Sequence, residues 1–177
     1  MGDPKKQKKK YQTPLHPWQK LRIEEEKEII KSYGLKNKKE IWKMNSFLRK
    51  INHQIKKLTS LQNKQAELEK KKILDRLQKL GLATKTSNLD EILGLTLKNI
   101  MERRLQTVLV RKFIASSMNQ ARQFITHKHV AVNGKKITSP SYLVSVIEEN
   151  SISFSSNSPF SDANHPARSI VRKEIKT

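Results

Sequence analysis

Three groups of side chains have residue types and spacings that could carry chemistry. His127 and His129 are two residues apart and could ligate a metal ion. Ser116 and Ser117 offer hydroxyl groups, and the run from 24 to 28 contains four glutamates. No third ligand with fitting spacing accompanies the histidines and the chain has no cysteine, so we predict no metal site.

The glutamates and serines do not form the patterns that catalysis needs. Neighbouring carboxylates on a helix point in different directions, and no histidine or Gly-rich loop stands beside this run. We interpret the glutamates as a solvated face that balances nearby lysines, and the serines as helix caps. The sequence therefore predicts a protein that is not an enzyme and has no cofactor.

The third group is cationic and lies between residues 101 and 136. This segment has one acid, Glu102, and eight cations: Arg103, Arg104, Arg111, Lys112, Arg122, Lys128, Lys135 and Lys136. If its helices and hairpin bury their apolar sides together, the cations share the remaining surface at fixed separations. Such a frame suits folded RNA, which proteins recognise mainly through backbone shape. B-DNA ranks lower because reading its major groove favours an exposed recognition helix.

Two helices are expected to position these cations. In the helix expected over 97–112, Ile100, Leu105, Val108 and Leu109 face a core. The cations expected to face outward are Arg103, Arg104, Arg111 and Lys112. The next helix starts with a Ser117–Gln120 capping-box pattern and buries Ala121, Phe124 and Ile125. Its N-terminus would place Ser116, Ser117 and Asn119 where a phosphate can be held.

A hairpin follows the second of these helices. Val130 and Val132 alternate with polar residues before Asn133-Gly134, the preferred pair for a type I′ turn. Residues 142–154 supply one or two further short strands, which gives a small sheet packed on the helices.

The N-terminal half contains amphipathic helices. One begins near Trp18 and ends at Gly34, and a second helix, from Lys38, carries apolar residues three and four apart. That apolar stripe consists of Ile41, Met44, Leu48, Ile51, Ile55 and Leu58. A third helix, 65–80, turns Ala66, Ile73, Leu77 and Leu80 inward and ends at Gly81. Asn88 and Glu91 form another capping-box pattern. These stripes are interpreted as core, with a groove for a partner helix as the alternative.

Composition favours a polyanionic partner. The 177 residues include 37 Lys+Arg and 16 Asp+Glu, a net charge of +21. Nucleic acid is the first candidate. An anionic membrane is second, although the sequence has neither a signal peptide nor an apolar run of eighteen residues. The basic segment 1–13 is interpreted as a disordered arm that orders on phosphates, or else as a solubilising tail.

Residues 102–144, ERRLQTVLVRKFIASSMNQARQFITHKHVAVNGKKITSPSYLV, resemble the alpha-L RNA-binding motif of the small-subunit ribosomal protein S-four family. The opening MGDPKKQKKKYQTPLHPW and the segments YGLKNKKEIW and LDEILGLT resemble its archaeal branch. The resemblance implies a cytoplasmic ribosomal protein that binds the 5′ domain of small-subunit RNA at a helix junction and nucleates assembly. It also implies a place near the decoding region and the site where mRNA enters, contact with small-subunit protein five, and a role in translational accuracy.

The resemblance also implies which residues contact RNA. These are Arg103, Arg104, Arg111, Ser116, Ser117, Gln120, Arg122, Gln123, His127, His129, Asn133 and Lys135, with Lys36, Lys38 and Lys39 in the helical half. Charge and position add Lys112, Asn119 and Lys136. Lys128 departs from the family pattern, which usually has Gly between the two histidines.

The expected architecture is α+β. A basic arm (1–15) and a helical domain (16–100) precede a small alpha-L domain (101–155), built as helix, helix and hairpin with a short antiparallel sheet, and a tail (156–177). An rRNA assembly factor of the same fold, an RNA-modifying enzyme and a membrane-surface protein are the alternatives. The second lacks room for a catalytic domain.

Overall fold

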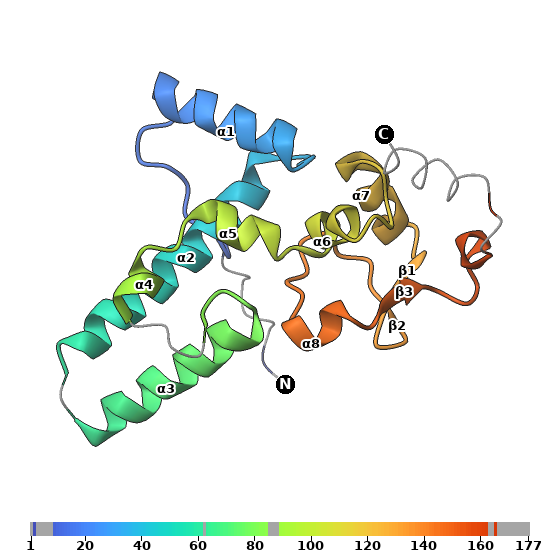
Figure 1. Cartoon of the computed structure of the whole chain (residues 1–177). Helices are drawn as coiled ribbons and strands as arrows, with labels where there is room; N and C mark the ends of the chain where they lie inside the picture. The colour runs from blue at the N-terminus through green and yellow to red at the C-terminus, as the bar shows by residue number, and fades with distance from the viewer. Residues whose placement is uncertain (1, 3–8, 62, 85–88, 163–164, 166–177) are drawn as a thin grey trace.

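The structure of the chain is a computed structural model that describes residues 2, 9–61, 63–84, 89–162 and 165. Helices α1 (Lys20–Ser32), α2 (Lys38–Thr59), α3 (Lys64–Lys79), α4 (Leu89–Leu93) and α5 (Leu97–Glu102) form a helical part. Helices α6 (Leu105–Arg111) and α7 (Met118–Thr126) cover a small sheet in the second part (Figure 1). The α+β architecture predicted from the sequence is confirmed.

The long helix α2 organises the helical part. Five of the six residues in its predicted stripe are buried, and Leu48 is half-buried. Ile51 and Ile55 pack with Leu77 of α3 and Ile92 of α4. The stripe is therefore core within this chain, because α3 and α4 cover its later part and α5 covers Ile41 and Met44. The predicted cap at Asn88 lies outside the described residues.

Helix α1 packs against this part and contains a buried glutamate that the sequence did not predict. Glu26 is 6% exposed, whereas the glutamate run was interpreted as a solvated face. Trp42 donates its indole N–H to Glu26 over 3.0 Å, and Lys38 pairs with the same carboxylate at 3.2 Å. The interpretation was wrong for Glu26, since partners from α2 supply the hydrogen bond and the charge that permit burial.

The single helix predicted over residues 97–112 is interrupted. Arg104 has an extended backbone (φ −72°, ψ 142°) and forms a β-bridge with Leu143. The amide of Leu105 donates to the Tyr142 carbonyl over 2.8 Å, and the amide of Val144 donates to the Arg103 carbonyl over 3.0 Å. The prediction of one continuous helix was wrong because pairing with residues 142–144 satisfies the backbone here.

The sheet has three antiparallel strands in the order β2-β1-β3. They are β1 (Val130–Val132), β2 (Lys135–Lys136) and β3 (Ile152–Phe154). Asn133 and Gly134 connect β1 and β2 with φ angles of 51° and 75°, as a type I′ turn requires. Lys128 also adopts a positive φ, 65°, at the tight turn from α7 to β1, a conformation that glycine adopts at lower cost.

Part of the segment expected to form strands is helical instead. Val146–Glu149 forms α8, which begins with a full capping box between Ser145 and Glu148. Only β3 follows it, and a short 3-10 helix, η1 (Pro159–Ser161), comes next. The core of this part gathers side chains such as Leu105, Val108 and Ile125 between α6, α7 and the sheet.

Candidate nucleic-acid interface

The N-terminus of α7 is built by its own serines. The hydroxyl of Ser117 accepts the amide N–H of Gln120 over 3.2 Å, which is the capping bond that the sequence predicts. The Gln120 side-chain oxygen accepts instead from the amide and hydroxyl of Ser116, each over 2.7 Å. Ser116, Ser117 and Asn119 are exposed. This helix end therefore presents polar groups to solvent in fixed positions.

The hairpin presents a second exposed group. Asn133, Lys135 and Lys136 are exposed, and β2 is an edge strand. Neither lysine forms an ion pair with any residue that the structure describes. Their charges are available to a partner, on a strand that β1 holds in register.

Glu40 joins the two parts of the molecule through two arginines. Arg104 and Arg122 both form ion pairs with its carboxylate, the second over 2.8 Å. Burial alone would raise the pKa of Glu40, but the hydrogen bonds from Arg122 and Arg104 outweigh it and hold that pKa below its ordinary value. The start of α2 is therefore fixed against α6 and α7.

Arg104 does not face solvent as the sequence predicted. Its side chain is 1% exposed and one guanidinium nitrogen lies 3.7 Å from the sulfur of Met101. The prediction of an outward side chain was wrong because the break before α6 turns this residue toward Glu40. In this structure the Arg104 guanidinium has no surface from which to reach a phosphate.

The other cations around α6 also have protein partners. Arg103 pairs with Glu149 at 2.9 Å and donates to the Val144 carbonyl. Lys112 donates to the Glu149 carbonyl. Arg111 pairs with Glu102 at 2.8 Å, but that pair is half exposed. Arg103 and Lys112 therefore attach α8 to the helices, and Arg111 remains accessible.

The two histidines occupy different environments. His127 is exposed, whereas His129 is half-buried, with Nδ1 2.9 Å from the Ser158 hydroxyl and the Phe160 ring against it. Burial, and then the nearby charge of His127, lower the pKa of His129. Among the residues that the structure describes, no three His, Asp or Glu side chains gather closely enough to hold a metal ion.

The helical part contributes lysines beside α7. Lys36 and Lys39 are exposed, and Lys38 is paired with Glu26. Lys39 lines a depression of about 270 Å³ with Lys43 and Arg122. Gln123, the neighbour of Arg122, is exposed. The structure therefore brings Lys39 and Arg122 to the same depression. Glu40, which also lines it, is 82 positions before Arg122 in the sequence.

Sequence reasoning missed the residues that hold this surface together. Glu40 and Glu26 are helix acids with no local signal of burial, because their partners lie on other elements. Gln106 was also missed: it is 1% exposed, and its amide donates to the carbonyls of Gly34 and Met118 over 3.1 and 2.9 Å. The one sequence signal for the burial of Gln106 is that it stands next to Leu105, which belongs to the apolar stripe of α6.

No helix in the described part of the chain has the length and apolar character needed to span a bilayer. Residues 103–149 match the family described as the S4 domain. Small ribosomal subunit protein uS4 of Methanococcus aeolicus is 49% identical over 177 residues, covering 99% of this chain and 100% of that relative. The proteins of the same name from Methanococcus maripaludis strains S2 and C5 are 47% and 46% identical over 175 residues, 98% of each chain.

Proposed function

The chain belongs to the uS4 family of small ribosomal subunit proteins, and from that premise we propose that it is a primary binder of small-subunit ribosomal RNA. As a ribosomal protein it has a structural rather than a catalytic role. The S4 domain is its RNA-binding module, and the proposed target is a helix junction in the 5′ domain. Binding there would nucleate assembly of the subunit.

The observation that carries this proposal is the set of accessible cations on a rigid frame. Lys36 just before α2, Lys39 in its first turn, and Lys135 and Lys136 on the hairpin are all exposed, as are the capping serines of α7. Partly buried ion pairs at Glu40 fix the separations between the two parts. A cationic surface with fixed spacing fits the backbone shape of one folded RNA better than that of others.

The residues predicted from sequence divide into two roles in this proposal. Direct contact is assigned to the accessible ones: Lys36, Lys39, Arg111, Ser116, Ser117, Asn119, Gln123, His127, Asn133, Lys135 and Lys136. Positioning is assigned to Arg103, Arg104, Lys112 and Gln120, whose polar groups are engaged within the protein. Lys38, Arg122 and His129 are partly exposed and partly engaged, and we assign them contacts at the margin.

The finer aspects of the proposed function rest on the family resemblance. They are contact with small-subunit protein five, a position near the decoding region and the site where mRNA enters, and an effect on translational accuracy. The surface around α8 suits a protein neighbour, because Ile147 is 79% exposed and the sequence has no Lys or Arg from 137 to 167.

Footprinting tests the proposed RNA target. Small-subunit RNA is probed with hydroxyl radicals in the presence and absence of the full chain. We expect protected nucleotides to cluster at the helix junction of the 5′ domain. Protection spread evenly over the RNA would contradict the proposal.

Sedimentation separates a resident subunit protein from an assembly factor of the same fold. A resident protein is expected in mature small subunits at one copy per particle, and an assembly factor only in precursor particles. The match over the whole length of ribosomal relatives supports the first outcome. Absence from mature subunits would contradict it.

A further inference from the structure

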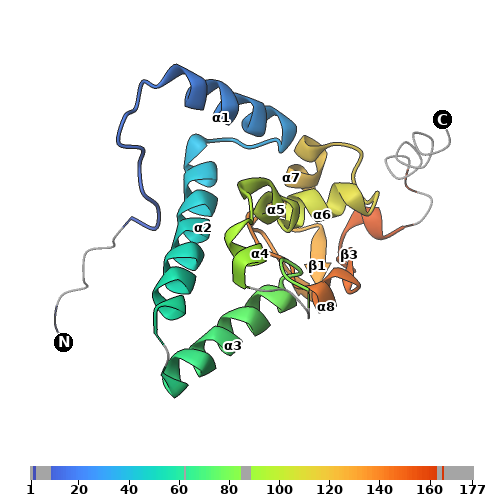
Figure 2. The same cartoon turned by 60° about the vertical axis from the view of Figure 1, so that its left-hand side comes forward.

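A second basic surface lies on α2, away from the S4 domain. Residues 9–12 pass along the side of α2 that faces away from the sheet (Figure 2) and enclose with it a groove of about 770 Å³. Five cations line the groove and no acid does: Lys9, Lys10, Lys43, Arg49 and Lys50. All five are exposed, and none forms an ion pair with a described residue.

The wall of this groove is attached to α2 at two points. The amide of Gln12 donates to the Ser46 hydroxyl over 2.9 Å, and that hydroxyl donates to the Trp42 carbonyl over 2.7 Å. The Tyr11 ring packs on the Trp42 ring with 6.0 Å between centroids. These contacts hold Lys9 and Lys10 opposite the helix instead of leaving them free in solvent.

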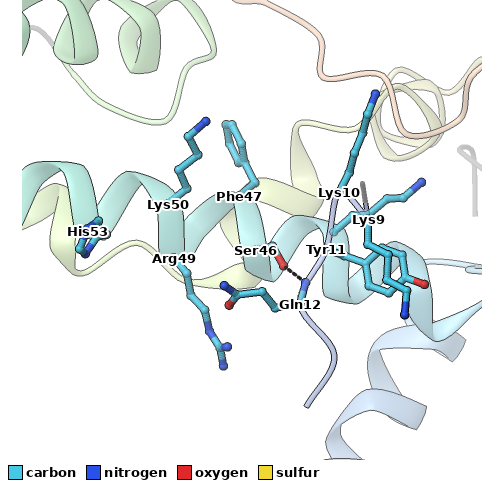
Figure 3. Close-up of a pocket in the computed structure, with 10 residues that line it drawn as sticks. Lys9, Lys10, Tyr11, Gln12, Ser46, Phe47, Arg49, Lys50 and His53 are labelled. Carbon is cyan, nitrogen blue, oxygen red and sulfur yellow. Dashed lines mark hydrogen bonds between the residues drawn. The ribbon is translucent and has the colours of Figure 1, made fainter. Parts of the chain in front are cut away.

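Aromatic side chains are interleaved with the cations. Lys43, Phe47 and Lys50 occupy one face of α2, since they stand four and three residues apart. Phe47 is half-buried; it packs in the helical core and also lines the groove, and the Arg76 guanidinium lies over its ring, 5.7 Å from the centroid. In Figure 3 the side chains of Lys10, Phe47 and Lys50 project to the same side, and Arg49 points the other way. An apolar ring thus lies between two ammonium groups.

We propose that this groove binds an unpaired nucleotide of the RNA, with its base packed on Phe47 and the flanking phosphates on Lys10 and Lys50. Alternating cations and aromatic rings match a single strand, because bases stack on rings while the backbone follows the charges. A duplex hides its base faces and would use only the lysines. This inference rests on the proposed function.

The groove is continuous with the surface assigned above. Lys43 lines both this groove and the depression that contains Lys39 and Arg122. One RNA strand can therefore run from α7 across α2 into the groove without leaving the basic surface. The sequence predicted only that the arm, which includes Lys9 and Lys10, orders on phosphates. It did not predict the α2 residues of the groove, because the arm and the middle of α2 come together only in the fold.

The test uses the full chain and a single-stranded octanucleotide of uridines with one central 2-aminopurine. Fluorescence anisotropy gives the affinity, and the 2-aminopurine emission reports base stacking. The variant F47L keeps an apolar side chain in the helical core but removes the ring. We expect F47L to weaken binding about tenfold and to remove most of the emission change.

Paired lysine variants provide the charge control. K10Q/K50Q removes two charges from the groove, and K71Q/K72Q removes two exposed charges from α3. We expect K10Q/K50Q to lower the slope of log affinity against log salt concentration by about 1.4 in magnitude, because each phosphate contact to a single strand contributes about 0.7 to that slope. K71Q/K72Q should change it much less. Equal losses in the two double variants would overturn the proposal.

Two further results would overturn it. One is an F47L variant that binds the octanucleotide with unchanged affinity and emission. The other is a polyglutamate of equal charge that competes as well as the RNA, which would indicate an acidic peptide site. Footprinting distinguishes the two proposals. If the wild type protects the 5′ domain but the groove variants bind the octanucleotide as the wild type does, only the groove proposal fails. If the wild type does not protect the 5′ domain, the proposed function itself fails.

Discussion

At the scale of single residues, Glu40 has the largest structural role. It is the shared partner of Arg104, which is 1% exposed, and Arg122, which is 24% exposed. A buried guanidinium without a counter-charge is costly, because desolvation is then no longer offset. The ion pairs of Glu40 with Arg104 and Arg122 therefore hold the two parts of the molecule together. The exposed lysines are not needed for that role and remain available to RNA.

Replacement of Glu40 by alanine should destabilise the fold. We expect the free energy of unfolding in urea to fall by about 3 kcal/mol or more, since a buried arginine loses its partner. The control is E102A, which breaks the half-exposed pair with Arg111 and should cost about 1 kcal/mol or less. Similar losses in the two variants would contradict the role assigned to Glu40.

Glu40 also predicts a pH dependence of stability. Its pKa in the folded chain is below its ordinary value of 4.5, so its contribution is complete above that value and is lost as the pH falls through the folded pKa. We expect the stability difference between wild type and E40Q to shrink between about pH 6 and about pH 3. The difference is needed because Glu148 also has a lowered pKa, through hydrogen bonds from Ser145 and Tyr142. A constant difference would argue against the ion pairs.

At the scale of elements, structure set by local sequence was predictable, and structure set by contacts distant in sequence was not. The stripe of α2 and the Asn133-Gly134 turn follow from spacing and backbone preference alone. The break at Arg104 was missed because it depends on Leu143, 39 residues later in the chain. The helix α8 was missed because Val146 and Ile147 have strand propensity, whereas the capping box at Ser145 favours a helix.

Two glycines at turns should differ in their tolerance of a side chain. Gly34 and Gly134 both have positive φ, 55° and 75°, but a Cβ at position 34 would come within 2.8 Å of the Met118 Cβ. A Cβ at 134 would meet nothing within 4 Å. We expect G134A to cost about 1 kcal/mol of unfolding free energy, from backbone strain. G34A should cost more, because α7 must also move; the reverse order in urea titrations would contradict this packing.

At the scale of the whole molecule, removing surface charge from the hairpin should weaken RNA binding without changing the stability of the fold. Lys135 and Lys136 are exposed on the edge strand, and their side chains form no hydrogen bond or ion pair with a residue that the structure describes. We expect K135Q/K136Q to retain its unfolding free energy within about 0.5 kcal/mol. Its affinity for the 5′-domain RNA should weaken, with a salt slope lowered by about 2, or about 1 for each phosphate contact. An unchanged slope would remove the hairpin from the interface.

The same scale explains which part of the candidate site the sequence revealed. The net charge of +21 and the cations between 101 and 136 indicated a polyanion and the region that meets it. They did not reveal that Arg103, Arg104 and Lys112 are used within the protein, since each depends on a partner distant in sequence. The groove between the arm and α2 was hidden for the same reason.

The most direct measurement is a titration of the full chain against two RNAs at several salt concentrations. One is a transcript of the small-subunit 5′ domain and the other is a duplex of equal length. We predict a preference of at least about a thousandfold for the transcript that persists as salt rises, because a shape-specific interface adds contacts beyond charge. Near-equal affinities that fall together with salt would contradict the account and leave only nonspecific attraction to phosphate.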